Sequence, residues 1–169
     1  EFNILIDLKE IKNKTFKKEN FYFLLIISLI FFLDRYSKFE ILRNFSENSF
    51  YVNDFLNFYL IWNTGIGFGL LSFDTNLIYN LITTLIGLLI IILIMIGIKS
   101  ESSEKIIFSI IVGGALGNFY DRIVFNAVPD FIDLHYGNFH WFTFNVADIF
   151  ITIGVIAFLI KGFFLKKIE

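Results

Sequence analysis

The stretch LIYNLITTLIGLLIIILIMIGI, residues 77–98, contains 22 consecutive residues without a charged side chain. A helix needs about 20 apolar residues to cross roughly 30 Å of hydrocarbon, so this stretch predicts a membrane-spanning helix. The composition agrees, because 56% of the 169 residues are hydrophobic and only 18% are charged, against about 45–50% and 25% in soluble domains. We therefore expect lipid to surround much of the chain.

Three shorter apolar runs, residues 21–33, 106–120 and 149–160, flank this helix along the chain. Each reaches the length of a span only by including charged residues at one end, which must then lie at the interface or inside a helix bundle. The sequence contains neither a repeat nor a flexible linker, so we expect one domain, residues 1–169. The predicted spans are, approximately, residues 21–38, 70–98, 104–122 and 146–165.

The distribution of lysine and arginine predicts the orientation of these spans. Lysines gather in the N-terminal segment, in the turn at residues 99–105 and in the tail, whereas residues 34–76 and 121–148 hold four basic residues between them. Positive charge favours the cytoplasmic side, so both termini are expected in the cytoplasm and both long connections outside. The charged ends of the three shorter runs then converge at the outer face.

The charged residues at membrane depth are the first candidates for function. Asp34 and Lys38 are four residues apart, a spacing that predicts an ion pair on one helix face, and an anchor for the end of the first span is the plainer interpretation. The motif NTGIGFG, residues 63–69, has three glycines in five residues and predicts a tight turn after the aromatic run 55–62, which is either a strand or an interfacial belt. The motif lacks the lysine of a phosphate loop.

The third span contains the small residues GGALG, 113–117, which favour close helix packing. Asn118, Asp121 and Arg122 follow and share one helix face. Arg122 beside Asp121 would keep that carboxylate ionised, so we expect an internal network here.

Asp130 and Asp148 are two carboxylates without a cationic neighbour in the sequence. Asp130 lies in an apolar setting after the only proline, and Asp148 lies at the outer end of the fourth span. If the two side chains meet, burial and like charge will make them share one proton at neutral pH. Such a pair can activate a water molecule against an amide, because one carboxylate takes its proton while the other polarises the carbonyl.

Other chemistries have weaker support. His135 and His140 are five residues apart, lack an HExxH spacing and would need a further ligand for zinc, so we expect outer-loop residues and no metal. Ser37 and Lys38 are adjacent and point about 100° apart on a helix, which disfavours a serine–lysine nucleophile. The absence of cysteine excludes disulfides and a cysteine nucleophile. We expect no cofactor.

Five motifs in order resemble the lipoprotein signal peptidases, also called signal peptidase II, over residues 20–160. They are DRYSK (34–38), NTGIGFG (63–69), GGALGNFYDR (113–122), VPDFID (128–133) and FNVAD (144–148). This resemblance implies an all-α membrane protein of four transmembrane helices with a small periplasmic β-sheet and a periplasmic helical loop. It also implies an intramembrane aspartic endopeptidase of the bacterial inner membrane, with its active site near the periplasmic face.

The reaction implied is removal of the signal peptide from diacylglyceryl-modified prolipoproteins by a cut before the lipidated cysteine. The resemblance assigns catalysis to Asp130 and Asp148 and treats Asp121 as structural. Substrate-binding or supporting residues by the same resemblance are Asp34, Lys38, Asn63, Gly65, Asn118, Arg122 and Asn145. The implied partners are lipid-modified signal peptides and membrane lipid, with no nucleic acid, and we expect a monomer.

Two positions depart from the family pattern. Many members have valine where this chain has Pro129, and many have proline where it has Phe142; neither position is charged or carries an amide side chain. A transporter and a membrane scaffold are the alternative functions. The acids converge at one face rather than the midplane and no inverted repeat is present, which disfavours a transporter. A scaffold should not bind an active-site-directed inhibitor such as globomycin.

Overall fold

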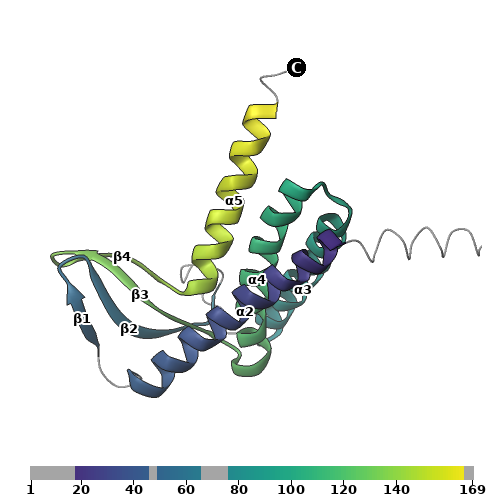
Figure 1. Cartoon of the computed structure of the whole chain (residues 1–169). Coiled ribbons are helices and arrows are strands. Elements are labelled where there is room, and N and C mark those ends of the chain that lie inside the picture. The colour runs from purple at the N-terminus through teal and green to yellow at the C-terminus, as the bar shows by residue number, and fades with distance from the viewer. Residues whose placement is uncertain (1–17, 46–48, 66–75, 166–169) are drawn as a thin grey trace, which may run out of the picture.

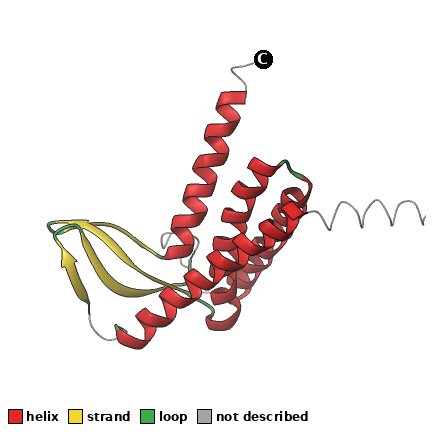
Figure 2. Cartoon of the chain, in the orientation of Figure 1, coloured by secondary structure: helices red, strands yellow, loops and turns green. Residues whose placement is uncertain are grey.

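The computed structural model describes residues 18–45, 49–65 and 76–165, and within them four helices are long and apolar enough to span a membrane. These helices are α2 (Lys18–Asn44), α3 (Asn76–Lys99), α4 (Ser102–Phe125) and α5 (Val146–Leu165). Four strands form one antiparallel sheet in chain order, namely β1 (Phe50–Asn53), β2 (Leu56–Asn63), β3 (Val128–Tyr136) and β4 (Phe139–Phe144). The predicted fold class, four spans with a small sheet, is confirmed (Figure 2).

The helix ends differ from the predicted ones in ways that the local sequence explains. α2 continues six residues past Lys38 because residues 39–43 contain no glycine or proline. α4 ends at Phe125 because Asn126 adopts a left-handed conformation, φ 53°, that asparagine tolerates and that commonly closes a helix. The first residues predicted for the second span, 70–75, lie outside the described residues.

Helix α4 lies at the centre of the bundle and contacts each of the other three helices (Figure 1). Its glycines permit this, because a Cβ on Gly113 would lie 2.8 Å from the Cβ of Ile30 and one on Gly114 would lie 2.6 Å from the carbonyl oxygen of Ala147. The prediction that these small residues allow close helix packing is confirmed. The buried apolar core is formed by Phe23, Ile27, Ile90, Phe108 and Val112.

The sheet joins the two long connections. β2, from the first connection, pairs with β3 of the second, so residues 56–63 lie beside residues 128–134. The aromatic run 55–62 is therefore largely a strand. His135 and His140 lie in strands β3 and β4, so the prediction that they belong to a loop was wrong. The strands were hard to predict because the hydrophobic pattern of this part of the sequence does not follow a clear two-residue period. The helical loop implied by the resemblance stays a prediction, because residues 46–48 and 66–75 of these connections lie outside the described part.

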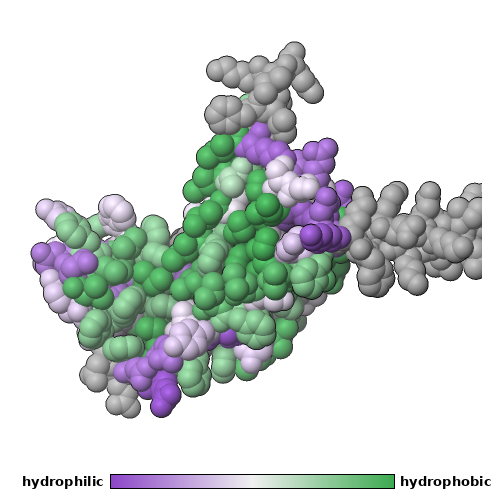
Figure 3. Space-filling model, in the orientation of Figure 1, coloured by the Kyte–Doolittle hydropathy of each residue, from purple (hydrophilic) through white to green (hydrophobic). Residues whose placement is uncertain are grey.

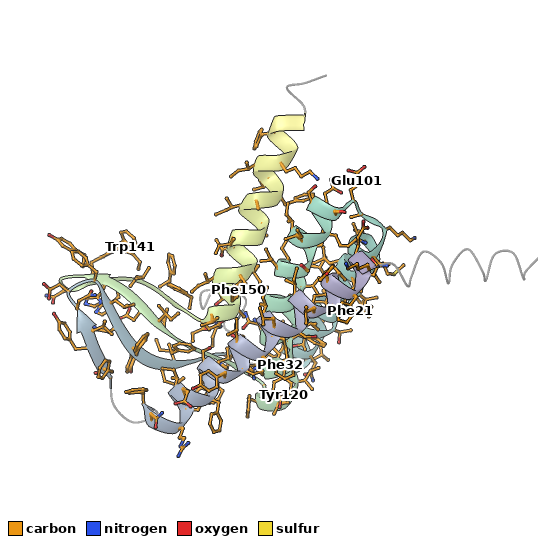
Figure 4. All side chains as sticks on the ribbon, in the orientation of Figure 1. Phe21, Phe32, Glu101, Tyr120, Trp141 and Phe150 are labelled. Atoms are coloured by element: carbon orange, nitrogen blue, oxygen red, sulfur yellow. The ribbon has the colours of Figure 1, made fainter. Side chains whose placement is uncertain are left out.

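The sheet lies at one end of the bundle, where α2 and α4 end and α5 begins (Figure 1). The turn between α3 and α4, at Glu101, lies at the other end, together with Phe21 near the start of α2 (Figure 4). Exposed apolar side chains cover the helices between the two ends, and hydrophilic residues gather at the ends (Figure 3). The described parts of both long connections thus lie on the same side of the apolar helix surfaces, as expected for four membrane-spanning helices.

Candidate active site

Asp130 lies near the start of β3, and its side chain is held by two amides. It is only 3% exposed. One carboxylate oxygen, Oδ2, accepts a hydrogen bond from Asn63 Nδ2 at 2.8 Å, and the other, Oδ1, accepts one from Asn145 Nδ2 at 2.6 Å. Both oxygens therefore have a donor, as a buried carboxylate requires.

Asn63, the last residue of β2, is itself fixed by the turn that follows it. Its Oδ1 accepts a hydrogen bond from the backbone N–H of Gly65 at 2.8 Å. This contact, typical of an Asx-turn, leaves Nδ2 free to donate to Asp130. The predicted turn is confirmed at residues 63–65, and the rest of the glycine motif, residues 66–69, lies outside the described residues.

Asp148 lies in the first turn of α5, where it and Asn145 form a capping box. The backbone N–H of Asp148 donates to Asn145 Oδ1 at 3.1 Å, and the backbone N–H of Asn145 donates to Asp148 Oδ2 at 3.2 Å. Asparagine before the helix and an acidic residue three positions later satisfy two otherwise unpaired donors at a helix start. The local sequence Asn-Val-Ala-Asp thus fixes both side chains.

Asn145 brings the two acidic side chains together, because it binds Asp130 through its side chain and Asp148 through its backbone. The pKa of Asp130 is raised to about 6, first because burial removes water from the carboxylate and then because of the negative charge of Asp148; the amides of Asn63 and Asn145 oppose this shift. The assumption that these two carboxylates meet is therefore supported by the geometry.

Asn118 and Lys38 connect Asp148 to a buried network of charges. Asn118 Nδ2 donates to Asp148 Oδ1 at 2.7 Å, while its Oδ1 accepts from Lys38 Nζ at 2.8 Å. The ammonium of Lys38, only 1% exposed, also donates to Asp34 at 2.9 Å and to Asp121 at 2.7 Å. The predicted ion pair between Asp34 and Lys38 is confirmed, but it belongs to an internal network rather than to a surface anchor.

Asp121 has different partners from those expected. Its carboxylate accepts two hydrogen bonds from the guanidinium of Arg35, at 2.5 and 2.8 Å, besides the one from Lys38. The expected partner, Arg122, instead donates to the carbonyl oxygens of Asn118 and Gly65, both at 3.2 Å. Adjacent residues on a helix point in different directions, and the guanidinium of Arg122 is directed at these two carbonyl oxygens.

Asp34 ties α2 to the start of α5. Its Oδ1 accepts a hydrogen bond from the backbone N–H of Ala147 at 3.0 Å, which satisfies one of the unpaired donors at a helix N-terminus. The carboxylate lies against Gly117 of α4, where any Cβ would overlap it. Three helices thus meet at this fully buried side chain.

All nine predicted site residues are brought together at the junction of bundle and sheet. They are Asp130, Asp148, Asp34, Lys38, Asn63, Gly65, Asn118, Arg122 and Asn145. Sequence reasoning missed Arg35, whose only signal was its place beside Asp34. The only group of three potential metal ligands found among the described residues, Asp133, His135 and His140, lies elsewhere on the sheet.

An apolar groove of about 240 Å³ opens beside Asp148. Leu134, Phe142 and Phe144 of the sheet form one wall, and Ile149 and Ile153 of α5 form the other. Among the described residues that line the groove, Thr152 is the one polar residue besides Asp148. A carboxylate at the edge of an apolar groove is suited to act on an apolar chain that enters from the membrane.

These features define the class as a multi-pass membrane protein with two carboxylates that share the ligand Asn145 at one end of its helix bundle. The signal peptidase (SPase) II family matches residues 26–164. The lipoprotein signal peptidase of Pelagibacter ubique is 53% identical over 153 residues, covering 88% of this chain and 92% of the relative. That of Anaplasma phagocytophilum is 41% identical over 140 residues, covering 80% and 88%.

A solved bacterial membrane enzyme has the same fold, with a TM-score of 0.70 and 32% identity over 88% of this chain and 90% of that one. The chain belongs to the signal peptidase II family. Membership implies a membrane peptidase whose family removes signal peptides from prolipoproteins.

Proposed function

We propose that Asp130 and Asp148 are the catalytic pair of an aspartic endopeptidase that releases the signal peptide of diacylglyceryl-modified prolipoproteins, cutting before the lipidated cysteine. The observation that carries the proposal is that Asn145 donates hydrogen bonds to both carboxylates. The chain that holds this arrangement belongs to the signal peptidase II family. The pKa of Asp130, raised to about 6, further supports it, since the shift brings protonation of this carboxyl closer to neutral pH.

In the proposed reaction the ionised carboxylate takes a proton from water as the water oxygen bonds to the peptide carbonyl carbon. The protonated carboxyl donates its proton to the carbonyl oxygen, so a neutral tetrahedral intermediate forms. The C–N bond then breaks as the leaving nitrogen takes the proton from the protonated carboxyl. The ionised carboxylate takes a proton from a hydroxyl of the intermediate, which releases the new carboxyl terminus and restores the single proton of the pair. Asn63, Asn145 and Asn118 hold the carboxylate oxygens in place through both steps.

The groove beside Asp148 supports an apolar, membrane-inserted substrate. Its walls are formed by five apolar side chains, and its polar end coincides with the carboxylate. We assign it to apolar segments of the lipid-modified precursor. Asp34, Lys38 and Arg122 act by positioning, because the hydrogen bonds that link each of them to the pair pass through another residue.

An in vitro cleavage assay tests the substrate class. A prolipoprotein carrying the diacylglyceryl group should be cut, and mass spectrometry should place the new N-terminus at the lipidated cysteine. The same precursor without the lipid is the matched control and should be cut much more slowly. Equal cleavage of both precursors, or a cut elsewhere, would contradict the proposed specificity while leaving the peptidase assignment in place.

We further propose that the chain lies in the bacterial inner membrane as a monomer, with both termini in the cytoplasm and the sheet in the periplasm. The turn between α3 and α4, which carries Lys99 and Lys105, lies at the end opposite the sheet and supports this orientation, as does the lysine content of the two terminal segments in the sequence. The chain has no cysteine, so single substitutions give a clean test. A membrane-impermeant maleimide should label Asn138→Cys in intact spheroplasts and Glu101→Cys only after permeabilisation; the reverse pattern would invert the topology.

A further inference from the structure

Three potential metal ligands gather on one face of the sheet, away from the aspartate pair. Asp133 and His135 are two residues apart on β3, so they face the same side, whereas Asp130 is three residues from Asp133 and faces the other. One ligand atom each from Asp133, His135 and His140 lie within 4.8 Å of one another. We propose that these three residues bind one divalent transition metal ion of the zinc class.

A β-bulge places His140 in this group. The β3–β4 ladder is regular up to the pair Leu134–Phe142, and the next pair is His135–His140 rather than His135–Trp141. An unbroken ladder would put Trp141 opposite His135 and turn His140 to the other face, because side chains alternate along a strand. A bulge changes that alternation and re-aims a side chain. The register shift therefore sets two imidazoles side by side, with ring centroids 5.2 Å apart.

Two buried atoms beside this group have no hydrogen-bond partner among the described residues. One is Nδ1 of His135, whose side chain is 8% exposed and whose Nδ1 lies 3.8 Å from Asp133 Oδ2. The other is Oδ1 of Asn57, whose amide nitrogen lies 3.5 Å from Nε2 of His135. Unpaired buried polar atoms are rare, so one in the His135 ring and another on the amide beside that ring point to a ligand-binding position.

A metal ion on His135 accounts for both atoms. If Nδ1 gives its lone pair to the metal, Nε2 carries the proton. A half-turn of the Asn57 amide then lets Oδ1 accept that proton in a hydrogen bond. Ligating histidines usually donate their second N–H in this way, which fixes the tautomer and the ring.

His140 completes the site from the exposed side. Its Nδ1 lies 2.8 and 3.0 Å from the two carboxylate oxygens of Asp133, a contact that a shared metal ion replaces. Its side chain is 57% exposed, so the ring can turn out of its stack on His135 to direct Nδ1 at the ion. A hollow of about 420 Å³ lined by Asp133, His140, Tyr59 and Thr143 leaves room for a water molecule as fourth ligand.

Two imidazoles and one carboxylate suit zinc, nickel or copper(II) rather than calcium or magnesium, which prefer oxygen ligands throughout. The ion would tie β4 to β3 within the hairpin that leads to Asn145. Its role is therefore structural: it stiffens the strand pair that carries Asp130, on the face opposite that residue. The inference does not depend on the proposed peptidase mechanism.

Isothermal titration of ZnCl₂ into the untagged, chelator-treated full chain in detergent tests the site. We expect one zinc ion per chain. His140→Gln should weaken zinc affinity by more than about tenfold, since even outer-shell partners of a metal typically contribute 10–100-fold. The exposed position of His140 means that this variant keeps its fold, which circular dichroism checks. Asp133→Asn, at a buried position, is the second variant.

Asp54→Asn is the matched control, because Asp54 is an exposed carboxylate of the same sheet region, in the β1–β2 turn outside the cluster. It should bind zinc as the unaltered chain does. Saturable binding that is equal in the unaltered chain and in His140→Gln would overturn the proposal. Absence of saturable zinc binding in the unaltered chain would do the same.

Discussion

Replacing Lys38 by methionine removes the only buried ammonium of the charge network while keeping an unbranched side chain of similar length. Lys38 Nζ donates to Asp34, Asn118 and Asp121 at 2.7–2.9 Å. Both aspartates are fully buried, so the variant leaves two carboxylates with Arg35 as the remaining cation that contacts them. The oxygen of Asn118 also loses its donor.

The size of the effect follows from burial. The two carboxylates left behind have no water and only Arg35 as a shared counter-ion. Removing one partner of a buried ion pair costs about 3–5 kcal/mol. For a chain of this length that corresponds to a fall in the unfolding midpoint of about 10 °C. Lys161 offers a matched control, since it pairs with Glu104 at 3.1 Å in a partly exposed position. Exposed pairs contribute below about 1 kcal/mol, so Lys161→Met should shift the midpoint by at most a few degrees.

Thermal unfolding of both variants in the same detergent, followed by circular dichroism, measures this difference. Cleavage of a lipidated precursor, measured well below both midpoints, should also fall in Lys38→Met, because Asn118 no longer has a fixed amide to offer Asp148. Equal midpoints for the two variants would refute the argument that the buried network stabilises the fold.

Three further predictions address the site and its supports. Asn145→Ala removes the cap of α5, so it should lower the free energy of unfolding by about 1 kcal/mol. It also removes a hydrogen-bond donor to Asp130, so the cleavage rate should fall by about a hundredfold. An unchanged rate would show that Asn145 does not contribute to catalysis. The pKa of Asp130, about 6, lies above its ordinary value, so the folded state binds a proton at this carboxyl more tightly than the unfolded state does. The free energy of unfolding should therefore rise as pH falls from 7 toward 4. Asp148→Asn should reduce that rise in denaturant titrations, and an identical pH profile would mean that the two charges do not interact. Gly117→Ala should lower the unfolding midpoint, because its methyl group would overlap the carboxylate of Asp34. Gly162→Ala should leave the midpoint within about 2 °C, because no atom lies near the added methyl group. Equal effects would contradict the close approach of α4 to Asp34.

The helices could be predicted from the sequence because an uncharged run of the right length has few other solutions in a membrane. The strands were harder to predict. β2 could be read as a strand or as an interfacial belt, and the β3–β4 hairpin contains a bulge that no spacing rule reveals. The third potential metal ligand, Asp133, was missed for this reason, since the two histidines alone did not suffice.

Within the site, local pairs were predictable and distant ones were not. The spacing of Asp34 and Lys38 predicts their contact, because both lie on one helix face. The pairing of Arg35 with Asp121 depends on how α2 packs against α4, which is set by glycines and apolar side chains rather than by the charges themselves. The link through Asn145 likewise requires the end of β4, the start of α5 and β3 to be in place together.

The central claim is that the carboxyl groups of Asp130 and Asp148 carry out peptide cleavage as a pair. The most direct measurement is the single-turnover rate on a diacylglyceryl-modified precursor for Asp130→Asn and Asp148→Asn, with Asp54→Asn as the control and circular dichroism to verify the fold of each. Both site variants should be folded and show no detectable cleavage, while the control keeps the rate of the unaltered chain. A folded Asp130→Asn or Asp148→Asn enzyme that still cuts at the unaltered rate would contradict the account.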